Sequence, residues 1–378
     1  MKTKILQEKL YQAVSQVEKI TGRDVTLPIL SNILLKAEKN SLTTIATNLE
    51  TGISWKLLSK TEEEGAVALP AQTLSGLVGS FPAGSIDIES DTTSVTVSGE
   101  KRKSTLKGLG ADEFPALPIS TEGECLTIKA EVFCQALAQV VNFTSSSSVK
   151  PEITGVYVVF SGNEIKVVAT DSFRLGEKTI KIPKGKVLSK EYQIILPARA
   201  VKEIISIFGD KQANINIFFS VNQITIEIDP GDDAVQPRIQ FVSRLIDGDF
   251  PDYKAIIPTT YAASMVFSKK ELLNHLKSAG LFAGKGNEIV IKLSQKEGVL
   301  IITSRSAELG DYESELKLEK NTGDDITITF NYRFLADGLN SIKDDKCAFE
   351  FSSDDGPGVL KPASEPDFIY ILMPIKKY

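Results

Sequence analysis

The apolar positions of this chain follow two periods, and the same succession of periods occurs three times. The first period, with apolar residues three or four positions apart, predicts an amphipathic helix early in each repeat. In the first repeat these positions are Leu6, Leu10, Val14, Val17 and Ile20. The second period is a strict alternation, as in residues 86–89 and 224–228, and predicts half-buried strands. We therefore expect two helices and about eight strands in each repeat, an α+β class.

Short sequence anchors give the length of the repeat. Leu69-Pro70-Ala71 opens an apolar stretch, Leu196-Pro197-Ala198 opens a similar one 127 residues later, and Phe330-Asn331-Tyr332 opens a third after 134 more. Ile45-Ala46-Thr47-Asn48 likewise recurs as Val168-Ala169-Thr170-Asp171. This period has the size of a whole domain and far exceeds that of a solenoid repeat. The predicted domains are residues 1–121, 122–257 and 258–378.

The composition is that of a well-packed soluble protein, with 42% apolar and 24% charged residues. No apolar run approaches the roughly 20 residues of a membrane span. The N-terminal residues turn polar at once and lack the apolar segment of a signal peptide. We therefore expect a cytoplasmic location and no membrane partner.

Side chains typical of catalysis are few. The one histidine, His275, lies in a predicted helix without a matching nucleophile. Gly284-Lys285-Gly286 lacks the spacing of a phosphate-binding loop. Cys125, Cys134 and Cys347 are too scattered for a disulfide framework or a zinc site, so we expect buried thiols. The sequence thus predicts a scaffold without catalytic residues, cofactor or metal.

Four motifs stand in order along the whole chain. They are TLPILSNILL at 26–35, ATDSFRL at 169–175, DGDFPDY at 247–253 and LMPI at 372–375. Together they resemble the bacterial sliding clamp, the β subunit of DNA polymerase III. The resemblance implies three domains of the DNA-clamp fold, each with two helices and antiparallel sheets, closing head to tail as a homodimeric ring with twelve helices around a hole.

The resemblance also implies a function. Such a ring is a processivity factor in DNA replication: it encircles duplex DNA without sequence preference and tethers the replicative DNA polymerase. The clamp loader and other proteins with a clamp-binding motif are further implied partners. A ring or arc-shaped protein-interaction scaffold that does not encircle DNA stays open as the alternative.

The charge distribution fits a ring around DNA. The six windows predicted to contain the inner helices carry a net charge of +7, which leaves −13 for the rest of a chain whose total is −6. A basic lining attracts phosphates without contacting bases. The candidate DNA contacts are Arg23, Lys150, Lys202 and Lys277. Lysine-rich exposed helix faces without a DNA role are the alternative interpretation.

The resemblance places a pocket for partner peptides between the second and third domains. The matching positions are Ile153, Thr170, Ser172, Phe173, Arg174, Leu175, Pro251, Ile256, Asn331, Phe334, Pro357, Ile371, Met373, Pro374 and Ile375. Apolar members would receive bulky peptide side chains, and polar members would hold the peptide backbone. Leu175, Ile371 and Ile153 fit the core of a sheet equally well. Phe173 stands where the family often has histidine, and Asp355 where it often has an apolar residue.

The resemblance places the dimer interface between the third domain of one chain and the first domain of another. Leu281 and Phe282 match the third-domain side, although both fit a core position equally well. Leu106, on a predicted strand near residues 103–109, matches the first-domain side. We expect this strand to extend a sheet across the interface.

Overall fold

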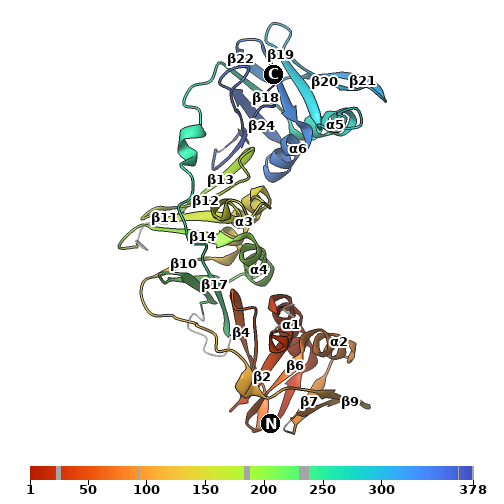
Figure 1. Cartoon of the computed structure of the whole chain (residues 1–378), viewed down its shortest axis with the longest axis vertical. Coiled ribbons are helices and arrows are strands. Elements are labelled where there is room, and N and C mark those ends of the chain that lie inside the picture. The colour runs from red at the N-terminus through yellow and green to blue at the C-terminus, as the bar shows by residue number, and fades with distance from the viewer. Residues whose placement is uncertain (23–26, 92, 183–187, 230–237, 365, 377–378) are drawn as a thin grey trace. The chain divides into compact units, whose positions relative to one another are not determined.

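A computed structural model describes residues 1–22, 27–91, 93–182, 188–229, 238–364 and 366–376 (Figure 1). The predicted DNA contact Arg23 lies outside these residues. The chain divides into two compact units. The first comprises Met1–Gln135, Leu188–Lys190 and Arg199–Leu245, and the second comprises Ala136–Val187, Glu191–Ala198 and Ile246–Tyr378.

The first unit contains two antiparallel sheets. The strands of the smaller sheet are β1 (Lys2–Leu6), β5 (Lys60–Glu63), β7 (Ser85–Ser90), β8 (Ser94–Gly99) and β9 (Arg102–Lys107), in the order β5-β1-β7-β8-β9. Those of the larger sheet are β2 (Asn32–Glu38), β3 (Ser41–Thr47), β4 (Thr51–Leu58), β6 (Gly65–Pro70), β10 (Cys125–Lys129), β15 (Asn214–Phe219), β16 (Gln223–Ile228) and β17 (Arg238–Arg244). The order β10-β15-β16-β17-β4-β3-β2-β6 joins strands of the first repeat to strands of the second through β4 and β17.

The second unit repeats this plan. Its larger sheet contains β11 (Gly155–Phe160), β12 (Glu164–Thr170), β13 (Arg174–Lys181), β14 (Tyr192–Pro197), β18 (Ala263–Ser268), β22 (Lys320–Gly323), β24 (Lys346–Phe351), β25 (Gly358–Pro362) and β26 (Phe368–Leu372). Their order is β14-β11-β12-β13-β26-β25-β24-β18-β22, so β13 and β26 join the second repeat to the third. The smaller sheet, in the order β21-β20-β19-β23, contains β19 (Glu288–Ser294), β20 (Val299–Ser306), β21 (Gly310–Lys317) and β23 (Ile326–Asn331).

Each repeat has two α-helices among the described residues, which confirms the predicted α+β class. They are α1 (Gln7–Val17), α2 (Ala71–Ser80), α3 (Ala130–Val140), α4 (Ala198–Phe208), α5 (Lys269–Ala279) and α6 (Tyr332–Ser341). In Figure 1, α1 and α2 lie side by side, and so do α5 and α6. Capping explains two of the starts: Ser268 Oγ accepts the Glu271 N–H (3.4 Å) and Asn331 Oδ1 accepts the Arg333 N–H (3.0 Å).

Two sequence expectations need correction. Leu6 was placed on the buried face of the first helix, but it ends β1 and is 58% exposed, because the chain passes from strand to helix without a loop. Cys134 and Cys347 are buried thiols as expected, and burial raises the pKa of each to about 12. Cys125 is exposed on β10, which is an edge strand of its sheet.

His275 on α5 is half-buried, and its Nδ1 lies 2.9 Å from Ser314 Oγ on β21. Within the described ranges, no group of His, Cys, Asp or Glu side chains gathers as a metal site would require. No helix in the same ranges is long and apolar enough to span a bilayer.

Glycines allow close approach where an aromatic ring packs on a helix. The fully buried Tyr370 ring of β26 lies against Gly338 of α6, where an added Cβ would lie 2.4 Å from ring carbons. The ring of Tyr332 lies equally close to Gly280, where an added Cβ would lie 2.6 Å from a ring carbon. These contacts set how closely α6 lies to the sheet and to the end of α5.

We predict opposite effects for two glycine-to-alanine changes. Gly338→Ala should lower the free energy of unfolding by about 1–3 kcal/mol, because the new methyl group overlaps the buried Tyr370 ring. Gly76→Ala on α2, with no atom within 4 Å of the added Cβ, should raise it by about 0.5–1 kcal/mol through helix propensity. Urea unfolding of both variants tests this, and a stabilised Gly338→Ala protein would contradict the packing.

Candidate peptide, DNA and dimer surfaces

Strand register brings three of the predicted peptide-site segments together at the ends of β13, β26 and β25, which are central strands of the nine-stranded sheet. Arg174 pairs with Leu372, and Leu372 also pairs with Gly358, which directly follows Pro357. The Met373 N–H then donates to the Phe173 carbonyl at 2.9 Å. The turn before β13, the segment after β26 and the start of β25 therefore lie next to one another. Ile375 is fixed there as well, because its N–H donates to the Thr329 carbonyl at 2.8 Å.

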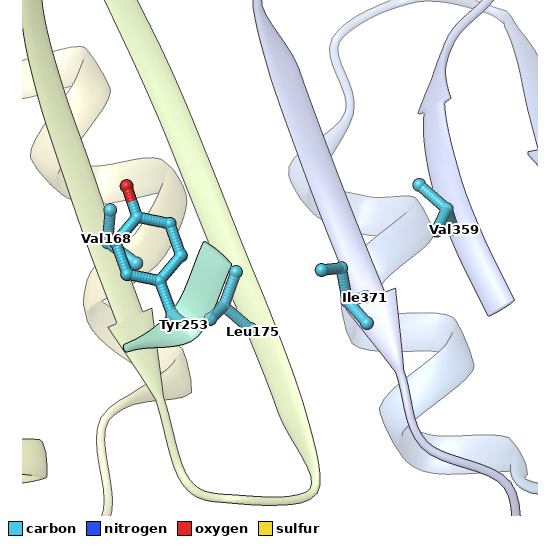
Figure 2. Close-up of a cluster of buried hydrophobic side chains, with 5 residues drawn as sticks. All are labelled: Val168, Leu175, Tyr253, Val359 and Ile371. Carbon is cyan, nitrogen blue, oxygen red and sulfur yellow. The ribbon is translucent and has the colours of Figure 1, made fainter. Parts of the chain in front are cut away.

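The floor of this region is a buried apolar cluster. It consists of Val168, Leu175, Tyr253, Val359 and Ile371 (Figure 2). Leu175 is 1% exposed and Ile371 is not exposed at all. Figure 2 shows Leu175 on β13 and Ile371 on β26 as neighbours, with Tyr253 close to Val168 and Leu175. Both predicted peptide contacts are thus core residues in this structure, the reading that the sequence had left open.

The rim carries apolar side chains that solvent reaches. Phe173 is 63% exposed and Ile256 is 40% exposed. The rings of Phe173 and Phe334 lie with centroids 6.4 Å apart, so the second and third repeats both contribute. The remaining rim members are Pro251, which is exposed, and Pro357, Phe334, Met373, Pro374 and Ile375, which are half-buried. We call these eight residues the peptide surface; exposed apolar groups gathered in this way are typical of partner binding.

The polar members of the predicted site are already hydrogen-bonded within the chain. Thr170 Oγ1 donates to the Arg174 carbonyl (2.7 Å) and accepts the Ser172 N–H (3.1 Å). Asn331 caps α6. Ile153 is buried, and its carbonyl accepts a backbone N–H. These groups shape the turn and the helix start beside the peptide surface, and their contact with a peptide backbone stays a prediction.

Arg174 is the most heavily engaged of them. Its Nε donates to Asp171 Oδ2 (2.9 Å) and its Nη1 to Asp337 Oδ2 (2.6 Å). The guanidinium carbon lies 4.4 Å from the centroid of the Phe334 ring and 5.3 Å from that of Phe143. Although burial opposes it, hydrogen bonds to Asp337 and Asp171 raise the pKa of Arg174 above its ordinary value. The charged group therefore ties the second repeat to α6.

Several residues of this region were missed from the sequence. Asp337 and Phe143 hold Arg174, Tyr253 and Val359 complete the floor, and the Tyr370 hydroxyl donates to the Phe334 carbonyl at 2.7 Å. Tyr253 stands in the DGDFPDY motif, which was its one available signal. Asp337 is 163 residues from Arg174, and no local pattern links them.

The described DNA candidates are exposed lysines. Lys202 lies on α4, Lys277 in the last turn of α5, and Lys150 directly before the 3₁₀ turn Pro151–Ile153. None of the three has an ion-pair partner within the described residues. They are free to meet a phosphate, as the sequence prediction requires.

The predicted dimer residues lie at two free sheet edges. Leu281, 69% exposed, follows the end of α5, and the ring of Phe282 stacks on Tyr312 of β21 with centroids 6.0 Å apart. Leu106 is half-buried on β9. In the described part of the chain, β21 pairs with β20 alone and β9 with β8 alone.

Comparison with known families accounts for this arrangement. Models of the DNA polymerase III beta subunit match three successive segments: the N-terminal domain at residues 1–118, the central domain at 127–252 and the C-terminal domain at 254–376. The chain belongs to the DNA polymerase III beta subunit family. It is a sliding clamp and a non-catalytic subunit, so the resemblance read from the sequence and its three-domain fold are confirmed.

Relatives of this clamp agree along its whole length. The beta sliding clamp of Streptococcus pneumoniae serotype 4 is 27% identical over 375 residues, 97% of this chain and 96% of the relative. That of Staphylococcus aureus strain Mu50 is 27% identical over 364 residues, 93% of each. The DNA polymerase sliding clamp of Bacillus subtilis has the same fold, with a TM-score of 0.92 at 23% identity over the whole of both chains. A Pseudomonas aeruginosa sliding clamp bound to griselimycin gives 0.92 at 24%, also over both chains.

We predict that floor and rim respond differently to truncation. Leu175→Ala should lower the free energy of unfolding by about 2–4 kcal/mol, because it opens a cavity in the floor. Phe173→Ala should change it by no more than about 0.5 kcal/mol, since the ring is largely in solvent. Denaturant unfolding with matched protein batches is the measurement. Equal losses from both variants would mean that the rim is part of the core.

Proposed function

We propose that two copies of this clamp close head to tail into a ring, encircle duplex DNA without reading its sequence, and hold replication proteins at the peptide surface. The proposal rests on an antiparallel strand pairing that joins neighbouring repeats and occurs twice within the chain. The two strands that would form a third such pairing each keep one unpaired edge among the described residues. The proposal keeps the domain division 1–121, 122–257 and 258–378, and it places the protein in the cytoplasm with the DNA that it serves.

Both internal junctions follow one rule. The second strand of a hairpin in one repeat pairs antiparallel with the last strand of the next repeat. In the first unit β4 pairs with β17, so that Ile53 lies opposite Phe241. In the second unit β13 pairs with β26, so that Leu175 lies opposite Ile371. Each pairing makes one continuous sheet across a repeat boundary.

The third pair of equivalent strands is β21 and β9. β21 follows β20 as β4 follows β3 and β13 follows β12, and β9 closes the first repeat as β17 and β26 close the others. Each has one free edge in the described chain. Pairing β21 of one copy with β9 of another would repeat the internal junction, and a head-to-tail contact made twice closes a two-chain ring.

The two edges carry opposite charges. β9 exposes Arg102, Lys103 and Lys107. β21 exposes three acids, Asp311, Glu313 and Glu315, and one base, Lys317, at its end. Opposite charges across an antiparallel pair stabilise it by about 0.2–1 kcal/mol for each pair. Leu281, Phe282 and Leu106 are the apolar residues beside these edges, as the predicted dimer interface requires.

The remaining partners follow from the surfaces described above. Lys150, Lys202 and Lys277 supply phosphate contacts, and such contacts are independent of base sequence. The replicative polymerase, the clamp loader and other proteins with a clamp-binding motif would compete for the peptide surface. A Pseudomonas aeruginosa sliding clamp binds griselimycin, and we propose that this chain binds the same compound at its peptide surface.

We predict that charge at the free edges controls assembly. Lys103→Glu with Lys107→Glu places acids opposite the acids of β21, so the double variant should sediment as a monomer near the 41.2 kDa chain mass. The parent protein should sediment at about twice that mass. Mixing the double variant with a Glu313→Lys, Glu315→Lys protein should restore a dimer. A parent monomer, or a dimeric Lys103→Glu, Lys107→Glu protein, would refute the interface.

We predict topological retention on DNA. The clamp, loaded by a clamp loader onto nicked circular DNA, should stay bound and should be lost when the circle is cut, because a ring slides off an end. Lys202→Glu with Lys277→Glu should lower loading most strongly at low salt, where phosphate contacts matter most. Equal retention on circular and linear DNA would favour the scaffold that does not encircle DNA.

A further inference from the structure

The hairpin turn at residues 47–51 of the first unit has a distinctive construction. The Thr47 hydroxyl donates to the Thr51 carbonyl (2.8 Å) and accepts the Leu49 N–H (3.0 Å). Leu49 has a φ of 71°, which a turn of this shape requires. The Glu50 carbonyl then accepts the N–H of Arg244, the last residue of β17, at 2.8 Å.

The turn at residues 170–174 of the second unit is built in the same way. The Thr170 hydroxyl donates to the Arg174 carbonyl and accepts the Ser172 N–H, and Ser172 has a φ of 77°. The Phe173 carbonyl accepts the N–H of Met373 at 2.9 Å. The backbone framework of the peptide surface is therefore present at both junctions. Only side chains distinguish them: Phe173 and Met373 at one, Glu50 and Arg244 at the other.

One difference concerns the bridge from the turn to the second helix of the next repeat. In the first unit Thr51 and Glu203 of α4 interact directly, and Glu203 is 9% exposed. In the second unit Arg174 stands at the position of Thr51, and Asp337 of α6 at that of Glu203. The side chains of an arginine–aspartate bridge span a greater length than those of a threonine–glutamate bridge. The planar guanidinium of Arg174 also packs against the rings of Phe334 and Phe143.

The longer bridge joins the two walls of the peptide surface. Arg174 belongs to the turn that carries Phe173, and Asp337 belongs to the helix that carries Phe334. The guanidinium lies over the Phe334 ring at 4.4 Å and leaves that ring 6.4 Å from Phe173, centroid to centroid. With both carboxylates and a ring in contact, Arg174 is held in one position.

We infer that Arg174 is a positioning residue: its bridge to Asp337 fixes the arrangement of the contacting Phe173 and Phe334 rings, and a partner at the second junction binds the apolar surface that these two rings form. The inference rests on the proposed peptide surface. It differs from a direct contact, because Arg174 acts through Asp337 and Phe334 and need not touch the partner.

A double-mutant cycle with griselimycin tests this. Calorimetric titration of the full chain compares the parent with Arg174→Ala, Asp337→Ala and the double variant. Each single change should weaken griselimycin binding by about tenfold. The double variant should bind no more weakly than either single variant, because all three variants lose the same Arg174–Asp337 bridge. Asp337 is half exposed, so its variant remains informative if Arg174→Ala folds poorly.

The control is Lys178→Ala. Lys178 lies on the same strand, and it also forms an ion pair with a third-repeat residue, Asp367, on the side away from the turn. It should destabilise the protein without changing griselimycin affinity, which separates positioning from general stability. Weakening by Arg174→Ala alone would assign a direct contact and overturn the inference, as would unchanged binding in both variants. Unchanged binding by Met373→Ala would instead argue against the peptide surface itself.

Discussion

The antiparallel pairing between neighbouring repeats is the constraint on which the rest of this structure depends. A repeat of this kind cannot satisfy the edge of its own sheet, since an unpaired strand leaves a row of N–H and C=O groups open. The pairings β4–β17 and β13–β26 satisfy these groups within the chain and fix each junction to the register of single residues. Because side chains alternate between faces, a slip by one residue would turn Leu175 and Ile371 out of the floor cluster.

The position of the peptide surface follows from the same pairing. Pairing ends where Arg174 meets Leu372, and the chain beyond that point is free to carry exposed side chains. Phe173 and Met373 use this freedom for apolar contact, whereas the first junction has Glu50 and Arg244 in the same framework. The same backbone framework thus carries the proposed partner site at one repeat boundary, and at the other boundary it only joins two repeats.

Local patterns of the sequence were sufficient for part of this account. Helices, strands and the three repeats follow from the apolar periods, and the resemblance to the clamp family singled out Phe173, Met373 and Leu281. Leu6 was misplaced because helical spacing and the end of a strand overlap at one residue. The bridge from Arg174 to Asp337 could not be read, since it joins residues 163 positions apart whose types are unremarkable in their own segments. Sheet order, which decides whether an edge is free, is equally invisible in the sequence.

The charges on β9 and β21 bear on unwanted pairing between free strand edges. A long unpaired strand invites pairing with any other edge, including its own copy in another molecule. Two β9 strands would place basic residues against basic residues, which is unfavourable. Pairing β9 with β21 instead brings Arg102, Lys103 and Lys107 toward Asp311, Glu313 and Glu315. In the proposed ring, the basic residues of β9 would therefore favour the head-to-tail contact and disfavour pairing of β9 with a second β9.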